Sequence, residues 1–368
     1  MPEILQRVAV QQRVLPAYRI PFFDALAGEC AGGLSIFAGK PRKSEGLLVG
    51  ARPSVAKYYA GRNIHLFGGM AYLCIQSGLL GWLKGWQPDV LIMEANPRYL
   101  SSRAALRWMK ARGGSVIGWG LGSPKPEGGV SRLRLCMRRH FVERFDALVT
   151  YSRQGADEYA ALGFARDRIF IAPNAVAHKP VQPLPERALN FRNNTPNVVF
   201  VGRLQARKRV DVLLQACALL PANVQPALTI VGDGAERGRL EALAKTVYPR
   251  VRFSGAQHGT DLEKIYRDAD LFVLPGTGGL AVQQAMSFGL PVIVGESDGT
   301  QSDLVREANG WMLRDASPQA LSSQMQAALA DIARLRTMGA ASYRIVSEEV
   351  NLENMVDAFV RAIQRVAG

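Results

Sequence analysis

The chain has 368 residues, of which 48% are hydrophobic and 21% are charged. This length is about twice that of a common domain, so we expect two domains, and the composition excludes an intrinsically disordered protein. Its 45 Lys and Arg against 31 Asp and Glu give a formal net charge of +14. Such a charge predicts attraction to an anionic partner: nucleic acid, an anionic membrane leaflet or a phosphate-bearing substrate.

Targeting signals and cysteines both favour a cytoplasmic protein. The segment Met1–Ala17 lacks the long apolar core and the small-residue cleavage site of a signal peptide, and no apolar run approaches the ~20 residues that span a bilayer. The cysteines lie in separate apolar stretches, which predicts buried thiols rather than metal ligands. They are Cys30, Cys74, Cys136 and Cys217.

In the first half, short apolar runs alternate with helix-compatible segments, which is typical of βαβ units around a parallel sheet. The expected strands are Arg7–Val10, Leu34–Ala38, Val90–Met93, Ser115–Trp119, Ala147–Thr150 and Ile169–Ala172. The segment Pro173–Pro196 is rich in proline and asparagine, so we place the domain boundary there.

The second half repeats the alternation and ends in a helix. Its expected strands are Asn197–Val201, Ala227–Val231, Val251–Ser254, Leu271–Leu274 and Val292–Val294, with helices at Val210–Leu219 and Gly238–Val247. The sequence therefore predicts Rossmann-like domains at 1–175 and 176–350, facing across a cleft. We expect the helix within 351–368 to pack back toward the first domain.

A basic turn in the second half predicts an anion site. The strand that ends at Gly202 is followed by Arg203, Lys208 and Arg209 around the start of a helix. Side-chain cations and the free N–H groups of a helix start both favour a diphosphate, which arginine can bind through two hydrogen bonds. A solvated basic turn is the alternative.

Two more glycine turns follow strands in the same half. The first is Gly232-Asp-Gly234, and the second is Gly276-Thr-Gly278-Gly279 before a helix that starts near Leu280. Glycine permits close approach of a ligand to the backbone, and the first N–H groups of a helix lack partners within the helix.

Together these turns resemble the donor domain of the GT-B glycosyltransferases, in particular the retaining family 4 enzymes. The resemblance runs from about Asn174 to about Leu313. It includes the Gly-Arg-Leu-x-x-x-Lys stretch at Gly202–Lys208, the Val-x-Phe-x-Gly strand at Val251–Gly255 and the Glu-Ala-Asn-Gly-Trp segment at Glu307–Trp311.

The resemblance implies the donor-binding residues. Arg203 and Lys208 would bind the donor diphosphate and assist catalysis. The further donor-binding residues that it implies are Gly202, Gly234, Ser254, Gly255, Ala256, Gly278, Gly279, Leu280, Ala281 and Gln284. The family has two glutamates eight positions apart around the third turn, where this chain has Gly276 and Gln284. Gln284 can still hydrogen-bond ribose hydroxyls, whereas Gly276 offers only backbone to a donor sugar.

Candidate acceptor residues lie in the first half. Glu94 ends a predicted strand, so it is either a base or acceptor ligand or an ordinary acid at a helix start. Trp119, followed by Gly120, would stack on an acceptor sugar or pack in the core. Tyr18 and Arg19 lie where family members place a loop beside the acceptor, and Arg19 would bind an acceptor phosphate or remain a surface arginine.

The segment Arg132–Arg144 has the pattern of a basic amphipathic helix. Leu133, Met137, Phe141 and Phe145 share helical spacing, with arginines on the other faces. It would contact an anionic membrane or use its apolar stripe in the core. The histidines lack metal spacing and no Asp-x-Asp pair follows a strand, so we expect no obligatory metal or other cofactor.

These observations predict a glycosyltransferase that moves a sugar from a UDP- or GDP-sugar to a glycan or lipid-linked acceptor, with the retention implied by the family. We expect it in cell-surface polysaccharide or glycolipid synthesis, in the cytoplasm or at the inner face of the plasma membrane. The alternative is a degenerate nucleotide-sugar-binding domain that serves as a non-catalytic partner subunit. No nucleic-acid-binding module is recognised, so charge alone supports that class.

Overall fold

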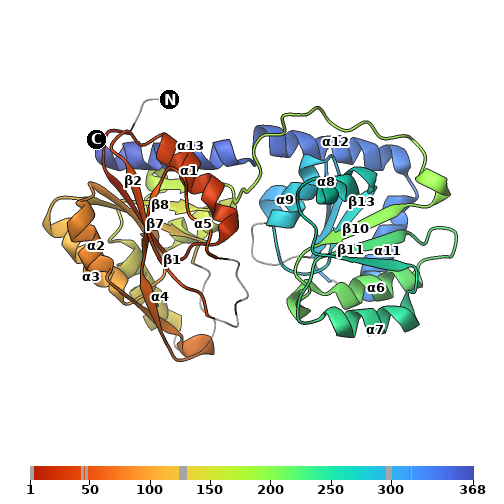
Figure 1. Ribbon diagram of the computed structural model, residues 1–368, viewed down its shortest axis with the longest axis horizontal. Helices are drawn as coiled ribbons and strands as arrows, with labels where there is room; N and C mark the ends of the chain where they lie inside the picture. The colour runs from red at the N-terminus through yellow and green to blue at the C-terminus, as the bar shows by residue number, and fades with distance from the viewer. Residues whose placement is uncertain (1–3, 43–44, 46–48, 124–130, 296–300, 316) are drawn as a thin grey trace. The chain divides into compact units, whose positions relative to one another are not determined.

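The computed structural model describes residues 4–42, 45, 49–123, 131–295, 301–315 and 317–368. The chain divides into two compact units. Unit 1 comprises Met1–Val176 together with Leu352–Gly368, and unit 2 comprises Ala177–Asn351. In each unit, helices cover both faces of a parallel sheet (Figure 1).

The sheet of unit 1 has the strand order β3-β2-β1-β6-β7-β8-β9. Its strands are β1 (Val8–Val14), β2 (Leu34–Gly39), β3 (Lys57–Ala60), β6 (Val90–Glu94), β7 (Ser115–Gly120), β8 (Ala147–Thr150) and β9 (Ile169–Ile171). All neighbouring strands run parallel. The order reverses between β1 and β6, and such a switch point is where doubly wound sheets bind ligands.

Two hydrophobic layers enclose this sheet. One contains α1 (Ile20–Gly28) and the C-terminal helix α13 (Leu352–Ala367), and the other contains α2 (Leu79–Trp86), α3 (Ser101–Ala111) and the end of α4 (Ser131–Val142). Helix α5 (Arg153–Ala161) follows β8, and its N-cap is Ser152, whose side chain accepts from the Gly155 N–H. A separate antiparallel hairpin joins β4 (Arg62–Leu66) to β5 (Leu73–Ser77).

An aromatic cluster holds α13 in unit 1. The ring of Phe359 lies 5.0 Å from that of Phe22 and 4.8 Å from that of Trp119, both in edge-to-face geometry. Phe359 is fully buried. The last helix of the chain therefore completes the core of the unit in which the chain starts.

The sheet of unit 2 has the strand order β12-β11-β10-β13-β14-β15. Its strands are β10 (Asn197–Val201), β11 (Ala227–Val231), β12 (Val251–Gly255), β13 (Leu271–Leu274), β14 (Val292–Gly295) and β15 (Gly310–Leu313). In order along the chain this is 3-2-1-4-5-6, the Rossmann arrangement, with its switch point between β10 and β13.

Helices cover both faces of this second sheet (Figure 1). The helices α6 (Val210–Leu219), α7 (Arg237–Val247) and α11 (Pro318–Leu329) lie on one side, and α8 (Gly259–Asp268), α9 (Leu280–Ser287) and α12 (Ile332–Glu348) lie on the other. The short helix α10 (Gln301–Leu304) precedes β15. Almost every residue of β13 and β14 is fully buried, which explains their uninterrupted apolar sequences.

The doubly wound α/β class is confirmed, and the differences lie at strands with weak apolar signals. β1 runs to Val14 rather than ending at Val10, because the buried amides of Gln11 and Gln12 find hydrogen-bond partners. The sequence analysis did not predict β3 and β15, which are four-residue edge strands and only partly covered.

Phe359→Ala should destabilise unit 1 by about 3–5 kcal/mol, because it leaves a cavity between two aromatic rings. Trp311 lies in unit 2 and the other four tryptophans lie in unit 1. Tryptophan fluorescence during thermal unfolding therefore reports mainly on unit 1, and its midpoint should fall. Leu219→Ala is the control, since Leu219 is 53% exposed, and an equal shift in both variants would contradict the assignment of α13 to this core.

Candidate functional site

Three turns lie next to one another at the carboxyl edge of the unit 2 sheet. They follow β10, β11 and β13, which are neighbours in the sheet. We call the turns 202–209, 232–236 and 275–279 together the glycine edge. The expected turns are thus brought to one place by the order of the strands.

Main chain packs directly on main chain within the glycine edge. The N–H groups of three residues donate to carbonyl oxygens of a neighbouring strand or turn: Gly202 to Val231 (3.0 Å), Leu204 to Asp233 (2.9 Å) and Thr277 to Arg207 (3.1 Å). A Cβ atom would overlap a neighbouring carbonyl oxygen at Gly232, Gly234 and Gly276. These glycines are therefore required by the contact between turns, whether or not a ligand is bound.

Lys208 is the charged centre of this edge. It ends a short 3-10 helix, Ala206–Lys208, and only 7% of the residue is exposed. Its Nζ donates to the carbonyl of Thr277, and a Cβ at Gly278 would overlap that Nζ. The ammonium group of Lys208 therefore lies between the first and third turns. It fits there because Gly278 has no side chain.

The other expected donor residues line the same edge or its continuation. Arg203 is half-buried and directly follows the end of β10. Gly279 is the N-cap of α9. Leu280 and Ala281 lie in its first turn, where helix geometry leaves N–H groups without carbonyl partners, and Gln284 lies one turn further on. Ser254, Gly255 and Ala256 lie at the end of β12, where the carbonyl of Gly255 accepts from Gly232 (2.7 Å).

Sequence reasoning missed Arg207 and Thr277. An Nη of Arg207 donates to the Thr277 hydroxyl (2.9 Å), so the exposed guanidinium is tied to the third turn. No motif singles out these residues, because their pairing depends on the adjacency of β10 and β13. Gly276 packs so closely on Arg207 that a glutamate there would need this turn to move.

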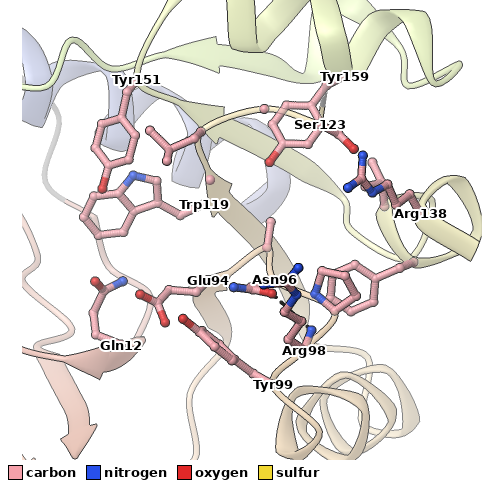
Figure 2. Close-up of a pocket in the computed structure, with 17 residues that line it drawn as sticks. Gln12, Glu94, Asn96, Arg98, Tyr99, Trp119, Ser123, Arg138, Tyr151 and Tyr159 are labelled. Atoms are coloured by element: carbon pink, nitrogen blue, oxygen red, sulfur yellow. Dashed lines mark hydrogen bonds between the residues drawn. The ribbon is translucent and has the colours of Figure 1, made fainter. Parts of the chain in front are cut away.

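A cavity of about 430 Å³ lies in unit 1, at the carboxyl ends of β6 and β7. Its lining includes Gln12, Glu94, Tyr99, Trp119 and Tyr151 (Figure 2). We call it the strand-end pocket. Glu94, Trp119 and Gly120 were expected near the acceptor, and the fold brings all three to this one pocket.

Glu94 is the carboxylate of the strand-end pocket. Its Oε2 accepts from the main-chain N–H of Arg13 (2.8 Å), and its own N–H donates to Oε1 of Gln11 (3.1 Å). Figure 2 shows the carboxylate between Gln12 and Tyr99. Desolvation raises the pKa of Glu94 to about 7, against the opposing effects of the N–H and charge of Arg13. Glu94 therefore exchanges a proton near neutral pH.

The structure places Trp119 in the core. It is 3% exposed and its ring packs on Phe22, Phe359 and Tyr151, with ring centroids 4.8–5.6 Å apart. Of the two expectations for this residue, core packing is therefore the one observed, and the ring faces are not open for sugar stacking. Its buried Nε1 has no hydrogen-bond partner within the described residues.

Arg19 differs from the expected surface arginine. It is 6% exposed, and its guanidinium donates to the carbonyl of Ala175 and to the side chain of Asn174. It also lies over the rings of Tyr151 and Tyr18, at 5.3 Å and 5.6 Å. Contact with an acceptor phosphate would break this packing, whereas Tyr18, which is 44% exposed, remains accessible.

The basic helix α4 divides between core and surface. Phe141 and Phe145 are buried, with ring centroids 5.3 Å apart, whereas Met137 is 55% exposed. The side chains of residues 131–134, including Arg132 and Arg134, lie outside the described part of the structure. Cys136 on this helix is exposed, so the expectation that all four cysteines are buried was wrong for this one. Apolar neighbours in the sequence do not determine which face of a helix a residue lies on.

Metal-binding clusters and membrane-spanning helices are both absent from the described residues. Among them, no group of three or more His, Cys, Asp and Glu side chains is arranged to hold a metal ion. Within the same residues, every helix is too short or too polar to cross a bilayer.

Two family models match the chain, one in each half. The model described as "Glycosyl transferases group 1" matches residues 183–344, and "Glycosyl transferase 4-like domain" matches residues 35–175. This chain belongs to the group 1 glycosyltransferases. The predicted family, the GT-B fold class and the transferase activity are confirmed.

Relatives of this glycosyltransferase include a D-inositol 3-phosphate glycosyltransferase of Xylanimonas cellulosilytica, 28% identical over 78% of this chain and 70% of that protein. A GDP-mannose-dependent alpha-mannosyltransferase of Mycolicibacterium smegmatis is 29% identical over 64% of this chain and 63% of that one. Among solved structures, Anabaena HepE in complex with UDP aligns with a TM-score of 0.73 at 14% identity, covering 98% of this chain and 100% of that chain.

Gly276→Ala should disrupt the glycine edge of this glycosyltransferase, because its Cβ would overlap the Arg207 carbonyl. We expect a loss of about 1–3 kcal/mol and faster amide hydrogen exchange in the peptides covering 202–209 and 275–280. Gly238→Ala is the matched control, because Gly238 lies in α7 with nothing within 4 Å of its added Cβ. Equal exchange in the two variants would show that the contact is not needed.

Glu94→Gln should change how stability depends on pH. As pH rises from about 4.5 to about 7, the unfolded chain releases the Glu94 proton while the folded chain keeps it, so the wild type loses up to about 3 kcal/mol of stability in this window. The variant lacks this loss. The wild-type melting temperature should therefore fall relative to that of the variant between pH 4.5 and 7.5, and parallel profiles would exclude a raised pKa.

Proposed function

We propose that this glycosyltransferase moves a sugar from a UDP- or GDP-sugar to a hydroxyl of a glycan or lipid-linked acceptor, with retention of anomeric configuration. Unit 2 binds the donor, and unit 1 binds the acceptor. The pathway would be the synthesis of cell-surface polysaccharide or glycolipid. Retention is supported by the resemblance to the retaining family 4 enzymes.

The observation that carries this proposal is the convergence of Arg203, Lys208 and side-chain-free backbone on one edge of unit 2. When the glycosidic bond to the donor breaks, negative charge builds on the departing nucleoside diphosphate. Fixed cations and backbone N–H groups stabilise that charge without reorganising, which lowers the barrier to transfer. Lys208 reaches the diphosphate by exchanging its contact with the Thr277 carbonyl for a phosphate oxygen.

The strand-end pocket supports an acceptor role for unit 1. A carboxylate with a pKa of about 7 both orients a hydroxyl through a hydrogen bond and accepts its proton at neutral pH. We assign this role to Glu94, with Gly120 and Tyr18 as further acceptor residues. Arg19 is left out of this set because its guanidinium is bound to Asn174 and Ala175.

Donor choice depends on the third turn and on α9. Gln284 supplies an amide for ribose hydroxyls, and Gly278 and Gly279 present backbone without side chains just before the first residue of α9. The donor sugar meets backbone at Gly276, with Arg207 and Thr277 beside it. The UDP complex of HepE supports a UDP-sugar donor, and the GDP-mannose-dependent relative supports a GDP-sugar donor. The proposal therefore includes both donor types.

The protein would work in the cytoplasm, at the inner face of the plasma membrane. Exposed Met137 and Arg139 of α4 support contact with an anionic leaflet. The alternative function is a non-catalytic subunit that binds a nucleotide sugar, and it is favoured by the replacement of both family glutamates by Gly276 and Gln284. Tight UDP or GDP binding without turnover of any donor would select that alternative.

Arg203→Ala and Lys208→Ala should each reduce kcat about 100-fold or more, because each removes a charge that acts on the leaving diphosphate. Turnover is followed as release of UDP or GDP in the presence of acceptor. Lys245→Ala on exposed α7 removes the same type of charge outside the site and should leave kcat unchanged. Near-normal turnover in both site variants, with the melting temperature preserved, would refute the assignment.

A further inference from the structure

The hairpin β4–β5 sorts its side chains onto two faces. Residues that pair across an antiparallel ladder share a face. One face carries the aliphatic pairs Ile64 with Ile75 and Leu66 with Leu73, and the other carries the pairs Asn63 with Gln76 and His65 with Cys74. The hairpin is therefore amphipathic.

The polar face of the hairpin points into unit 1. Cys74 is fully buried and Gln76 is 4% exposed. The side-chain amide of Gln76 donates to the carbonyl of Gln12 (3.0 Å), and that of Asn63 donates to the carbonyl of Arg13 (2.7 Å). The polar residues thus anchor the hairpin to the end of β1, which reverses the usual arrangement of a half-exposed sheet.

The aliphatic face of the hairpin points outward. Ile64 is 40% exposed, and Leu66, Leu73 and Ile75 are half-buried. Within the described residues, none of these four side chains packs against the buried hydrophobic clusters of unit 1. An outward row of four aliphatic side chains is costly in water, so such a patch indicates a binding surface.

The turn of the hairpin extends this apolar surface. Phe67 directly follows β4, is 72% exposed and has a φ of 57°. The left-handed conformation is unfavourable for a residue other than glycine, and an exposed aromatic ring loses the benefit of burial. Both the backbone conformation and the exposure of Phe67 at the tip of the hairpin are therefore unfavourable in water.

The segment that contains the hairpin is rich in cations. From Lys40 to Lys84 the sequence contains seven Lys and Arg residues but a single acid, Glu45. Glu45 is bound to Arg13 (3.1 Å), so it does not offset the outer charge. Arg62 lies on the hairpin's aliphatic face and is exposed. Lys40 is exposed beside the hairpin, where its carbonyl accepts from the side-chain amide of Asn63 (2.9 Å).

We propose that the hairpin β4–β5 docks on an anionic lipid bilayer. Phe67 and the aliphatic row enter the interfacial region, and Arg62 with the neighbouring cations meets the lipid phosphates. The excess of cations over acids favours this occupant over a neutral protein surface or a second copy of this equally basic chain. Docking here is separate from helix α4 and does not depend on glycosyl transfer.

The location of the hairpin gives this docking a consequence for the acceptor. The Cys74 N–H donates to the carbonyl of Arg98 (3.0 Å), and Arg98 borders the strand-end pocket (Figure 2). A bilayer held at the hairpin would therefore lie close to the mouth of that pocket. This last step rests on the proposed function, whereas the docking itself does not.

The test is flotation of the full chain with vesicles of phosphatidylcholine alone or with about one quarter phosphatidylglycerol. The variants are the double substitution Ile64→Ser with Phe67→Ser, the single substitution Arg62→Gln, and the control Val181→Ser, which is 98% exposed in unit 2. The wild type should bind the anionic vesicles. The double variant should bind at least about tenfold more weakly, since it loses two apolar side chains that would enter the bilayer. Arg62→Gln should weaken binding chiefly at low salt.

Four outcomes overturn the proposal. The first three are no flotation of the wild type, equal flotation of the wild type and the double variant, and a wild-type dimer that the double variant loses, which would assign the face to a second copy. Met137→Ser in α4 is run alongside, and loss of binding in that variant alone would likewise place the contact on α4. Circular dichroism and the melting-temperature shift with UDP and GDP check the fold, and they also separate failure of docking from failure of donor binding.

Discussion

Direct contact between main chains at the carboxyl edge of the unit 2 sheet is the constraint on which the candidate donor site depends. Gly232, Gly234 and Gly276 each pack against a carbonyl oxygen of the neighbouring turn. A Cβ at any one of them would push the two turns apart. Closeness of the turns is also what brings Lys208 within reach of the Thr277 carbonyl.

The sequence was sufficient for the class of fold and for the position of the glycine edge, because buried strands and glycine turns leave strong local patterns. Val199 to Arg209 illustrates this, since an apolar strand, a glycine and the cations Arg203, Lys208 and Arg209 stand in one continuous stretch. Contacts between distant segments left no such pattern. Arg207 with Thr277 and Arg19 with Asn174 depend on strand order and helix placement, and neither could be found without the structure.

The end of β1 links two features of unit 1 that are distant in sequence. Gln11 and the backbone of Arg13 hold Glu94, while the carbonyls of Gln12 and Arg13 hold the polar face of the hairpin. Buried polar residues in a central strand are costly unless they are bonded, and here each finds a partner. Gln11 and Gln12 interrupt the apolar pattern of β1, which is why its second half was not predicted. The same two residues form hydrogen bonds to Glu94 and to Gln76 of the hairpin.

The place of α13 in unit 1 has a consequence for how the protein is made. Phe359 and its helix belong to the core that starts with β1, yet the ribosome adds them after all of unit 2. Unit 1 therefore cannot complete its core until α13 has been synthesised. Until then, Phe22 and Trp119 lack their contact with Phe359. Trimming of the carboxyl terminus would accordingly damage the amino-terminal domain, while leaving the other one whole.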